Sequence, residues 1–88
     1  MYKVLVSRTF QKIFNSLNKS VQKRIKAGLN ELEKDPIKAR ANADISPLSV
    51  TKPQKHRLRV GEYRIVYLIE KKTVRVIEVF KRGRGYRK

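Results

Sequence analysis

The sequence contains no cysteine, no tryptophan, a single histidine and only seven acidic residues among 88. Without cysteine, the chain has no disulfide, no thiolate nucleophile and no cysteine-ligated zinc site. Its one histidine, His56, is too few for a histidine-cluster metal site. No apolar run approaches the roughly 18 residues that a membrane-spanning helix needs, and the first residues do not follow a signal-peptide pattern. We therefore expect a cytoplasmic protein with no metal, no cofactor and no membrane partner.

What the sequence has in abundance is positive charge. Lysine and arginine number 23, which gives a formal net charge of +16. Such a charge on a small domain opposes compaction and is typical of proteins that bind a polyanion. Valine, leucine, isoleucine and phenylalanine make up 26 of the 88 residues, well above the content of about 20% typical of disordered chains. We therefore expect a packed core and one domain spanning residues 1–88.

The first half of the chain predicts one strand and two helices. Residues 2–7 are rich in β-formers and predict a strand. Apolar residues then recur with helical spacing in two stretches, at Phe10, Ile13, Phe14 and Leu17, and at Val21, Ile25, Leu29 and Leu32. Thr9 and Ser20 are the candidate N-caps, and Asp35 before a proline should end the second helix. The short link between the helices predicts an antiparallel helical hairpin, with Gly28 at its close approach.

The second half predicts a sheet. Residues 37–55 hold proline among small polar residues, which indicates a long connection with a short helical or extended piece near residues 45–50. The period then changes from 3.6 to 2, and three strands joined by tight turns are predicted at residues 56–60, 63–70 and 73–81. They form a three-stranded antiparallel meander. The predicted fold is therefore α+β, in the order β-α-α-β-β-β, with the helices packed on one face of a twisted sheet.

Most of the positive charge lies in this second half, where the last 37 residues hold 13 basic and three acidic residues. Arg57 and Arg59 are two residues apart in a predicted strand, so both project from one face of the sheet. Arg64 begins the next strand and joins them if the register allows. Guanidinium groups bind phosphate bidentately, and Tyr63 and Tyr86 offer stacking surfaces for bases. We expect this face to bind nucleic acid or phosphate.

The chemistry open to such a site is limited. Glu31 and Asp35 are the one carboxylate pair at helical spacing, interpreted as surface charge, so the carboxylate cluster of two-metal catalysis is missing. RNA can be cut without metal because its own 2′-hydroxyl is the nucleophile. The protein must then supply a base, cations for the charge on the phosphorane, and a proton for the leaving oxygen. Arginine suits the second task but rarely deprotonates. His56 titrates near neutrality, and it is either a catalytic group or a packed core residue.

Two segments of the sequence resemble a known family. The sequence Val-Gly-Glu-Tyr-Arg-Ile-Val-Tyr at residues 60–67, preceded by His-Arg-Leu-Arg, resembles the signature of the RelE/ParE toxin superfamily. The closing Lys-Arg-Gly-Arg-Gly-Tyr at residues 81–86 resembles the RelE branch, in which basic residues and a tyrosine follow the last strand. The resemblance covers nearly the whole chain, as one RelE-like domain with a basic tail at residues 82–88.

The resemblance implies a toxin of a type II toxin–antitoxin system. RelE-type toxins are ribosome-dependent mRNA endonucleases that occupy the A site of the small ribosomal subunit. They cut the codon there through the 2′-hydroxyl, without a metal or cofactor. The expected partners are therefore the ribosome, mRNA and an acidic RelB-like antitoxin.

The resemblance also assigns roles to residues. Arg64 and Arg82 match arginines that stabilise the transition state. Arg57 and Arg59 fall where well-studied members have lysines, one of them proposed as the base, so the identity of the base stays open. Tyr86 falls near the catalytic or stacking tyrosine of the family. The residues expected to contact RNA are Lys55, His56, Tyr63, Lys81, Arg84 and Arg87.

Two other functions are compatible with the sequence. ParE-like toxins poison DNA gyrase and share the Tyr-Arg motif, but usually lack the basic C-terminal residues and tyrosine. Arg82, Arg84 and Tyr86 therefore favour RNA cleavage. The other alternative is a non-catalytic RNA- or ribosome-binding protein, in which the basic sheet only docks.

Overall fold

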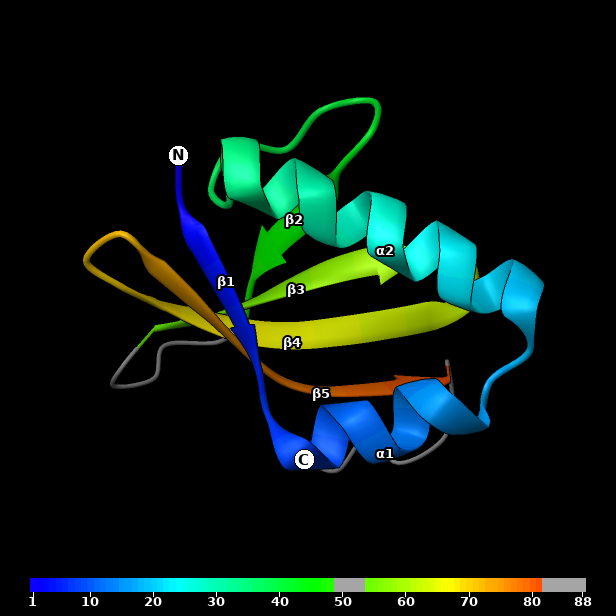
Figure 1. The fold of residues 1–88 in the computed structure, drawn as a ribbon. Coiled ribbons are helices and arrows are strands. Elements are labelled where there is room, and N and C mark those ends of the chain that lie inside the picture. Colours follow the sequence, from blue (N-terminus) through cyan, green and yellow to red (C-terminus); the bar gives the residue numbers. More distant parts are fainter. Residues whose placement is uncertain (49–53, 82–88) are drawn as a thin grey trace.

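The computed structural model describes residues 1–48 and 54–81 (Figure 1). The elements follow in the order β1 (Lys3–Val6), α1 (Arg8–Ser16), α2 (Lys19–Lys34), β2 (Asp44–Pro47), β3 (Lys55–Val60), β4 (Tyr63–Glu70) and β5 (Thr73–Lys81). The strands form one sheet in the order β1-β5-β4-β3-β2. Both helices cover the same face of this sheet, and no described helix covers the other, which we call the open face (Figure 1). The predicted α+β fold is confirmed.

The meander forms as the alternation of residues predicts. β4 and β5 have the predicted bounds, and β3 begins one residue earlier than expected. β4 lies between β3 and β5, antiparallel to both, and is the middle strand of the five. The turns contain Gly61 at φ 59° and Lys71 at φ 56°, left-handed backbone conformations typical of tight hairpins. Local pattern and turn chemistry were sufficient to define this part of the fold.

The two edge strands were not fully predicted. β1 pairs with β5 in parallel, so the sheet is mixed rather than purely antiparallel. In this position Val4 and Val6 of β1 reach the core under the helices. The short helical or extended piece expected near residues 45–50 is extended over Asp44–Pro47, which is β2 and pairs antiparallel with β3, while residues 49 and 50 lie outside the described residues.

The helix N-caps differ from the predicted ones. The Ser7 side chain accepts a hydrogen bond from the backbone N–H of Phe10 at 3.0 Å, and Asn18 Oδ1 accepts one from Val21 at 2.9 Å. Thr9 and Ser20 therefore lie inside the first turns of α1 and α2 and are not caps. Serine and asparagine are both strong N-caps, and their extended backbone lets the strand or turn lead directly into the helix. α2 ends before Asp35 as predicted.

Gly28 has a different neighbour from the expected one. A Cβ at this position would lie 3.0 Å from Leu58 Cδ2 and 3.2 Å from Val60 Cγ2, both on β3. The glycine therefore allows close approach of α2 to the sheet, not to α1, which packs on β5. The core between helices and sheet is built around the buried residues Phe10, Ile25, Leu32, Leu58, Ile65, Tyr67, Val74, Val76 and Val79.

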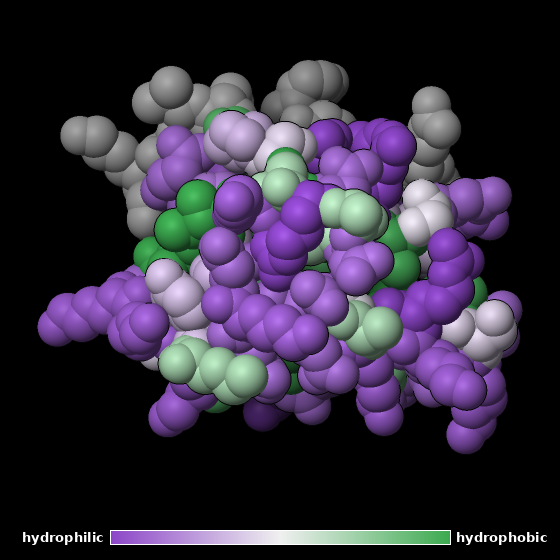
Figure 2. Space-filling model, turned by 90° about the horizontal axis from the view of Figure 1, so that it is seen from above, coloured by the Kyte–Doolittle hydropathy of each residue, from purple (hydrophilic) through white to green (hydrophobic). Residues whose placement is uncertain are grey.

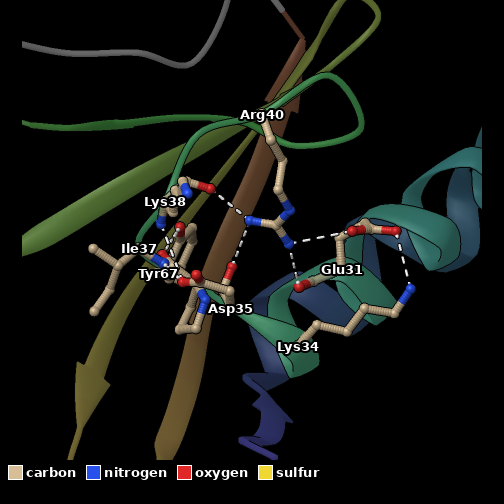
Figure 3. A network of polar contacts seen from close by, with 8 residues as sticks. Glu31, Lys34, Asp35, Ile37, Lys38, Arg40 and Tyr67 are labelled. Carbon is tan, nitrogen blue, oxygen red and sulfur yellow. Dashed lines mark hydrogen bonds and ion pairs between the residues drawn. The ribbon is translucent and has the colours of Figure 1, made fainter.

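Arg40 orders the connection between α2 and β2 through hydrogen bonds of its guanidinium group (Figure 3). One guanidinium nitrogen donates to the backbone carbonyls of Asp35, at 2.9 Å, and Lys38. The other donates to Glu31, to its carbonyl at 2.8 Å and its carboxylate at 3.2 Å. Lysine could not make these contacts together, because a guanidinium presents several donors in one plane. The arginine thus adds a second donor to the Glu31 carbonyl, which also accepts from the Asp35 N–H, and joins the end of α2 to the carbonyls of Asp35 and Lys38 that follow it.

Two further contacts order the same connection. The Asp35 carboxylate accepts hydrogen bonds from the backbone N–H groups of Ile37 and Lys38, which lower the pKa of this carboxyl. The buried Tyr67 hydroxyl of β4 donates to the carbonyl of Pro36 at 2.7 Å. Glu31 and Asp35, expected to be surface charges, therefore help to fix the path of the chain that leads into β2.

The outer side of α2 is a solvated surface. Figure 2 looks onto the side that carries α2 and shows it to be predominantly hydrophilic. The exposed positions of α2 include Lys19, Lys23, Lys26 and Lys34. The helix side of the molecule therefore shows no broad apolar surface in this view.

None of the helices in residues 1–48 and 54–81 has the length and apolarity required to cross a membrane.

Candidate nucleic-acid interface

Three arginines of the predicted site meet on the open face of the sheet. Arg59 of β3 lies directly opposite Arg64 of β4 in the strand register, and Arg57 is two residues away from Arg59. The alternate residues Leu58 and Ile65 are buried in the core under the helices. Because neighbouring residues of a strand point to opposite faces, the three arginines share the open face, as the sequence predicts. We call Arg57, Arg59 and Arg64 the arginine cluster.

The members of this cluster differ in their partners. Arg57 donates to the Ser46 hydroxyl at 2.6 Å, and the Nε of Arg59 lies 3.2 Å from the Asp44 carboxylate. The Nε atoms of Arg57 and Arg64 are buried and donate to no partner among residues 1–48 and 54–81. Buried donors are normally satisfied, and leaving one unsatisfied costs about 1–3 kcal/mol. The arginine cluster therefore has hydrogen-bonding capacity that the described residues leave unused.

The electrostatics of the cluster favour an anion. Like charges directly opposite on neighbouring strands destabilise a sheet, and Arg59 and Arg64 form such a pair. A phosphate between them would relieve this repulsion and accept hydrogen bonds from their guanidinium groups. The Arg59 side chain is 48% exposed, so a ligand can reach it from solvent.

Lys55 also lies on the open face. It begins β3, two residues before Arg57, and faces Leu68 of β4 in the register. The far part of this face is apolar: Leu5, Leu68 and Ile77 line a shallow hollow together with Arg75. Arg75 is paired with Glu70 at 2.6 Å. The open face is thus basic near the β3–β4 turn and partly apolar toward β1.

The structure does not bring three other predicted site residues to the arginine cluster. His56 faces Tyr67 on the helix side, with ring centroids 5.6 Å apart, and burial lowers its pKa. Tyr63 packs against the core, and Lys81 lies opposite Tyr63 and pairs with Glu62 at 3.6 Å. These positions support the interpretation of His56 as a packed residue.

The remaining predicted residues, Arg82, Arg84, Tyr86 and Arg87, lie outside the described residues. Within the two described ranges, no group of three or more histidine, aspartate and glutamate side chains is placed to hold a metal ion.

Sequence reasoning missed Asp44 and Ser46. Both belong to β2 and lie opposite Arg59 and Arg57 in the register. The available signal was the alternation of Asp44, Ile45 and Ser46, in which only Ile45 is buried. A strand of four residues ending in proline is too short for this alternation to stand out.

Comparison with known proteins identifies the family. Residues 2–86 match the sequence profile of the ParE toxin of the type II toxin–antitoxin system parDE. The chain belongs to the RelE/ParE toxin superfamily. It is a toxin of a type II toxin–antitoxin system. No curated protein sequence matches this toxin.

Solved structures of RelE-type toxins have the same fold as this toxin. The archaeal RelE–RelB complex from Pyrococcus horikoshii contains a chain with 28% identity and a TM-score of 0.81, over 96% of this chain and 98% of that one. The RelBE complex of E. coli shows 27% identity and a TM-score of 0.64, over 96% and 100% of the two chains. The RelB–RelE complex of Methanococcus jannaschii shows 25% identity and a TM-score of 0.72, over 88% of each chain.

Proposed function

We propose that this toxin is a ribosome-dependent mRNA endonuclease and that the arginine cluster binds the scissile phosphate. The observation that carries the proposal is the pairing of Arg59 and Arg64 on the open face, with the Nε of Arg64 buried and unpartnered. A purely structural arginine in this position would be expected to have its buried donor satisfied. The structural similarity to RelE chains supports the same proposal.

The proposed reaction uses the mRNA 2′-hydroxyl as the nucleophile. A base takes the proton of the 2′-hydroxyl as its oxygen attacks the adjacent phosphorus and forms the new O–P bond. The bond to the 5′-oxygen breaks and that oxygen is protonated, which leaves a 2′,3′-cyclic phosphate and a 5′-hydroxyl. Negative charge develops on the phosphorane oxygens, where Arg64 and Arg59 would stabilise it. Arg57 would hold the neighbouring backbone. Lys55, on the same face, would contact RNA farther along the strand.

The base of this reaction stays open, and two further residues are placed at the reacting phosphate only by resemblance. Arg82 and Tyr86 match the second stabilising arginine and the catalytic or stacking tyrosine of RelE-type toxins. A Tyr86→Phe substitution separates the two roles of the ring, because phenylalanine stacks but cannot donate a proton. If phenylalanine preserves cleavage and alanine abolishes it, the ring acts by stacking.

Primer extension on mRNA tests the proposed function. Purified toxin is added to translating ribosomes, and the same mRNA is incubated with toxin alone. We expect cuts at codon-positioned sites only in the sample with ribosomes. Cleavage of the free mRNA at the same sites, or no cleavage in either sample, would contradict the proposal.

A second candidate function is poisoning of DNA gyrase, favoured by the match to the ParE profile. It predicts that the toxin inhibits supercoiling by purified gyrase and leaves mRNA intact on ribosomes. The open face fits gyrase poisoning less directly, because that function does not require a buried arginine Nε that lacks a partner among the described residues. A gyrase assay at the toxin concentration of the primer-extension experiment decides between the two.

We also propose that an acidic RelB-like antitoxin covers the open face. The RelE chains of similar structure were crystallised as complexes with RelB. An amphipathic acidic segment would place carboxylates on the arginine cluster and apolar side chains in the hollow around Leu5 and Leu68. Opposite charge accelerates such an encounter. Antitoxin binding that leaves Arg59 and Arg64 accessible to a guanidinium-modifying reagent would contradict this interface.

A further inference from the structure

β2 contributes two polar side chains to the open face, and both contact the arginine cluster. Asp44 lies opposite Arg59 and Ser46 opposite Arg57 in the β2–β3 register. Asp44 Oδ2 is 3.2 Å from Arg59 Nε, and Ser46 Oγ accepts a hydrogen bond of 2.6 Å from Arg57. Ile45, between them, is buried in the core, so β2 is anchored with these two side chains outward.

The two contacts have different electrostatic consequences. The serine hydroxyl orients Arg57 and leaves its charge in place. The Asp44 carboxylate orients Arg59 and also neutralises it. Both partners of the Asp44–Arg59 pair are about half exposed, at 55% and 48% of the side chain. An exposed ion pair is weak, so a phosphate can replace the carboxylate at Arg59.

We propose that Asp44 is a positioning residue and internal counter-ion of the site, which competes with the RNA phosphate for Arg59. In the free toxin, Asp44 offsets the repulsion between Arg59 and Arg64. When RNA binds, the phosphate takes over the Arg59 guanidinium and Asp44 is released to solvent. Asp44 thereby limits the affinity of the site for RNA. This inference rests on the proposed function.

The chain provides a matched control for this idea. Glu70 forms an ion pair with Arg75, and the two side chains are 55% and 54% exposed. Glu70 lies at the other end of β4 from Arg64, about 20 Å away along a strand of this length. Asp44→Asn and Glu70→Gln each raise the net charge by one. Only the first removes a carboxylate from the arginine cluster.

The test measures binding of a 2′-O-methyl RNA oligonucleotide, which the 2′-hydroxyl reaction cannot cleave, by fluorescence anisotropy over a range of salt. We expect Asp44→Asn to bind about two- to fivefold more tightly than the parent toxin at low salt. The slope of log K against log salt should stay close to that of the parent, because Arg59 contacts the same phosphate in both complexes and the number of neutralised phosphates does not change. Glu70→Gln should change the RNA affinity less. Asp44→Glu should bind RNA as tightly as the parent toxin, because it keeps a carboxylate at this position.

The effect must also depend on Arg59. In an Arg59→Gln background, Asp44→Asn should leave RNA affinity unchanged, because the carboxylate has no cation left to neutralise. Equal effects of Asp44→Asn and Glu70→Gln, or an effect that persists without Arg59, would overturn the inference. If Arg59→Gln and Arg64→Ala both bind RNA as tightly as the parent, the proposed function fails instead, and the inference fails with it. Thermal unfolding of each variant verifies that it is folded.

Discussion

An arginine on the helix side of the sheet and an arginine on the open face differ in whether their donors have hydrogen-bond partners. On the helix side, Arg40 donates to three backbone carbonyls and one carboxylate, and so joins the end of α2 to the connection that follows it (Figure 3). On the open face, Arg64 has a buried Nε with no partner in the described part of the chain and faces another arginine. The first arrangement contributes to stability, and the second reduces it. Natural proteins accept such local costs mainly where a ligand will bind, so the contrast separates a structural arginine from a functional one.

Substitution of Arg64 should produce the largest effect. We expect Arg64→Ala to lower the rate of mRNA cleavage on ribosomes by about 10²–10³, the usual loss for one group that stabilises transition-state charge. The urea midpoint should not fall, because the substitution removes a buried unpartnered donor and a repulsive pair. Single-turnover primer extension and urea unfolding measure the two quantities.

Arg75→Ala is the control for this experiment. Arg75 is on the same face of the sheet but is paired with Glu70 away from the arginine cluster. It should retain cleavage close to the parent rate. If Arg64→Ala cleaves within threefold of the parent, or if Arg75→Ala is equally impaired, the distinction drawn between the arginines is wrong.

Substitution of Arg40 should show the reverse pattern. We expect Arg40→Ala to lower the free energy of unfolding by about 2 kcal/mol, since it leaves several carbonyls without their charged donor. Arg40→Lys should be intermediate, because one ammonium group cannot reach all four acceptors. Cleavage per folded molecule should stay near the parent value. A loss of cleavage without a loss of stability would place Arg40 in the functional site.

Removal of the Tyr67 hydroxyl should produce a smaller loss. Tyr67 is fully buried, and burial raises its pKa, so its hydroxyl remains a donor to the Pro36 carbonyl. Tyr67→Phe keeps the ring and should cost about 1–1.5 kcal/mol of unfolding free energy. Differential scanning calorimetry should show this as a lower melting temperature. An unchanged melting temperature would mean that this bond does not hold the connection to β2.

The pH dependence of stability tests the burial of His56. Burial lowers the pKa of His56 below its ordinary value of 6.5. The unfolded chain therefore binds a proton at a higher pH than the folded toxin does, and stability falls as pH is lowered through about 6.5. His56→Phe keeps a ring against Tyr67 and cannot titrate. Urea unfolding between about pH 8 and pH 5 should show a weaker pH dependence for the variant than for the parent, and equal slopes would contradict this account.

The meander could be predicted from the sequence because its signals are local. The two-residue period and the turns at Gly61 and Lys71 determined the bounds of β4 and β5, and the same alternation placed Arg57 and Arg59 on one face. The register of β3 and β4 follows from a two-residue turn. That register is what brings Arg64 opposite Arg59. The best-predicted part of the fold is therefore also the part that builds the arginine cluster.

The contacts that were missed depend on tertiary structure. Nothing in the sequence around Arg40 shows that its guanidinium reaches back to Glu31. Asp44 and Ser46 acquire their roles only when β2 is placed beside β3. His56 alternates with Arg57, so its face is determined by the side on which the helices pack. Sequence alone gave the residue types, while the choice between a packed histidine and a catalytic one required the fold.

The pairing of β1 with β5 has a consequence for the order of folding. The Ser7 hydroxyl donates to the carbonyl of Ile77, a contact that spans 70 residues. Contacts of such separation close the largest loop in the chain and form late, whereas hairpins such as β3–β4 and β4–β5 form within microseconds. The hairpin register that carries the arginine cluster should therefore be established before β1 joins the sheet. A newly made chain would present an anion-binding surface while its first strand is still undocked.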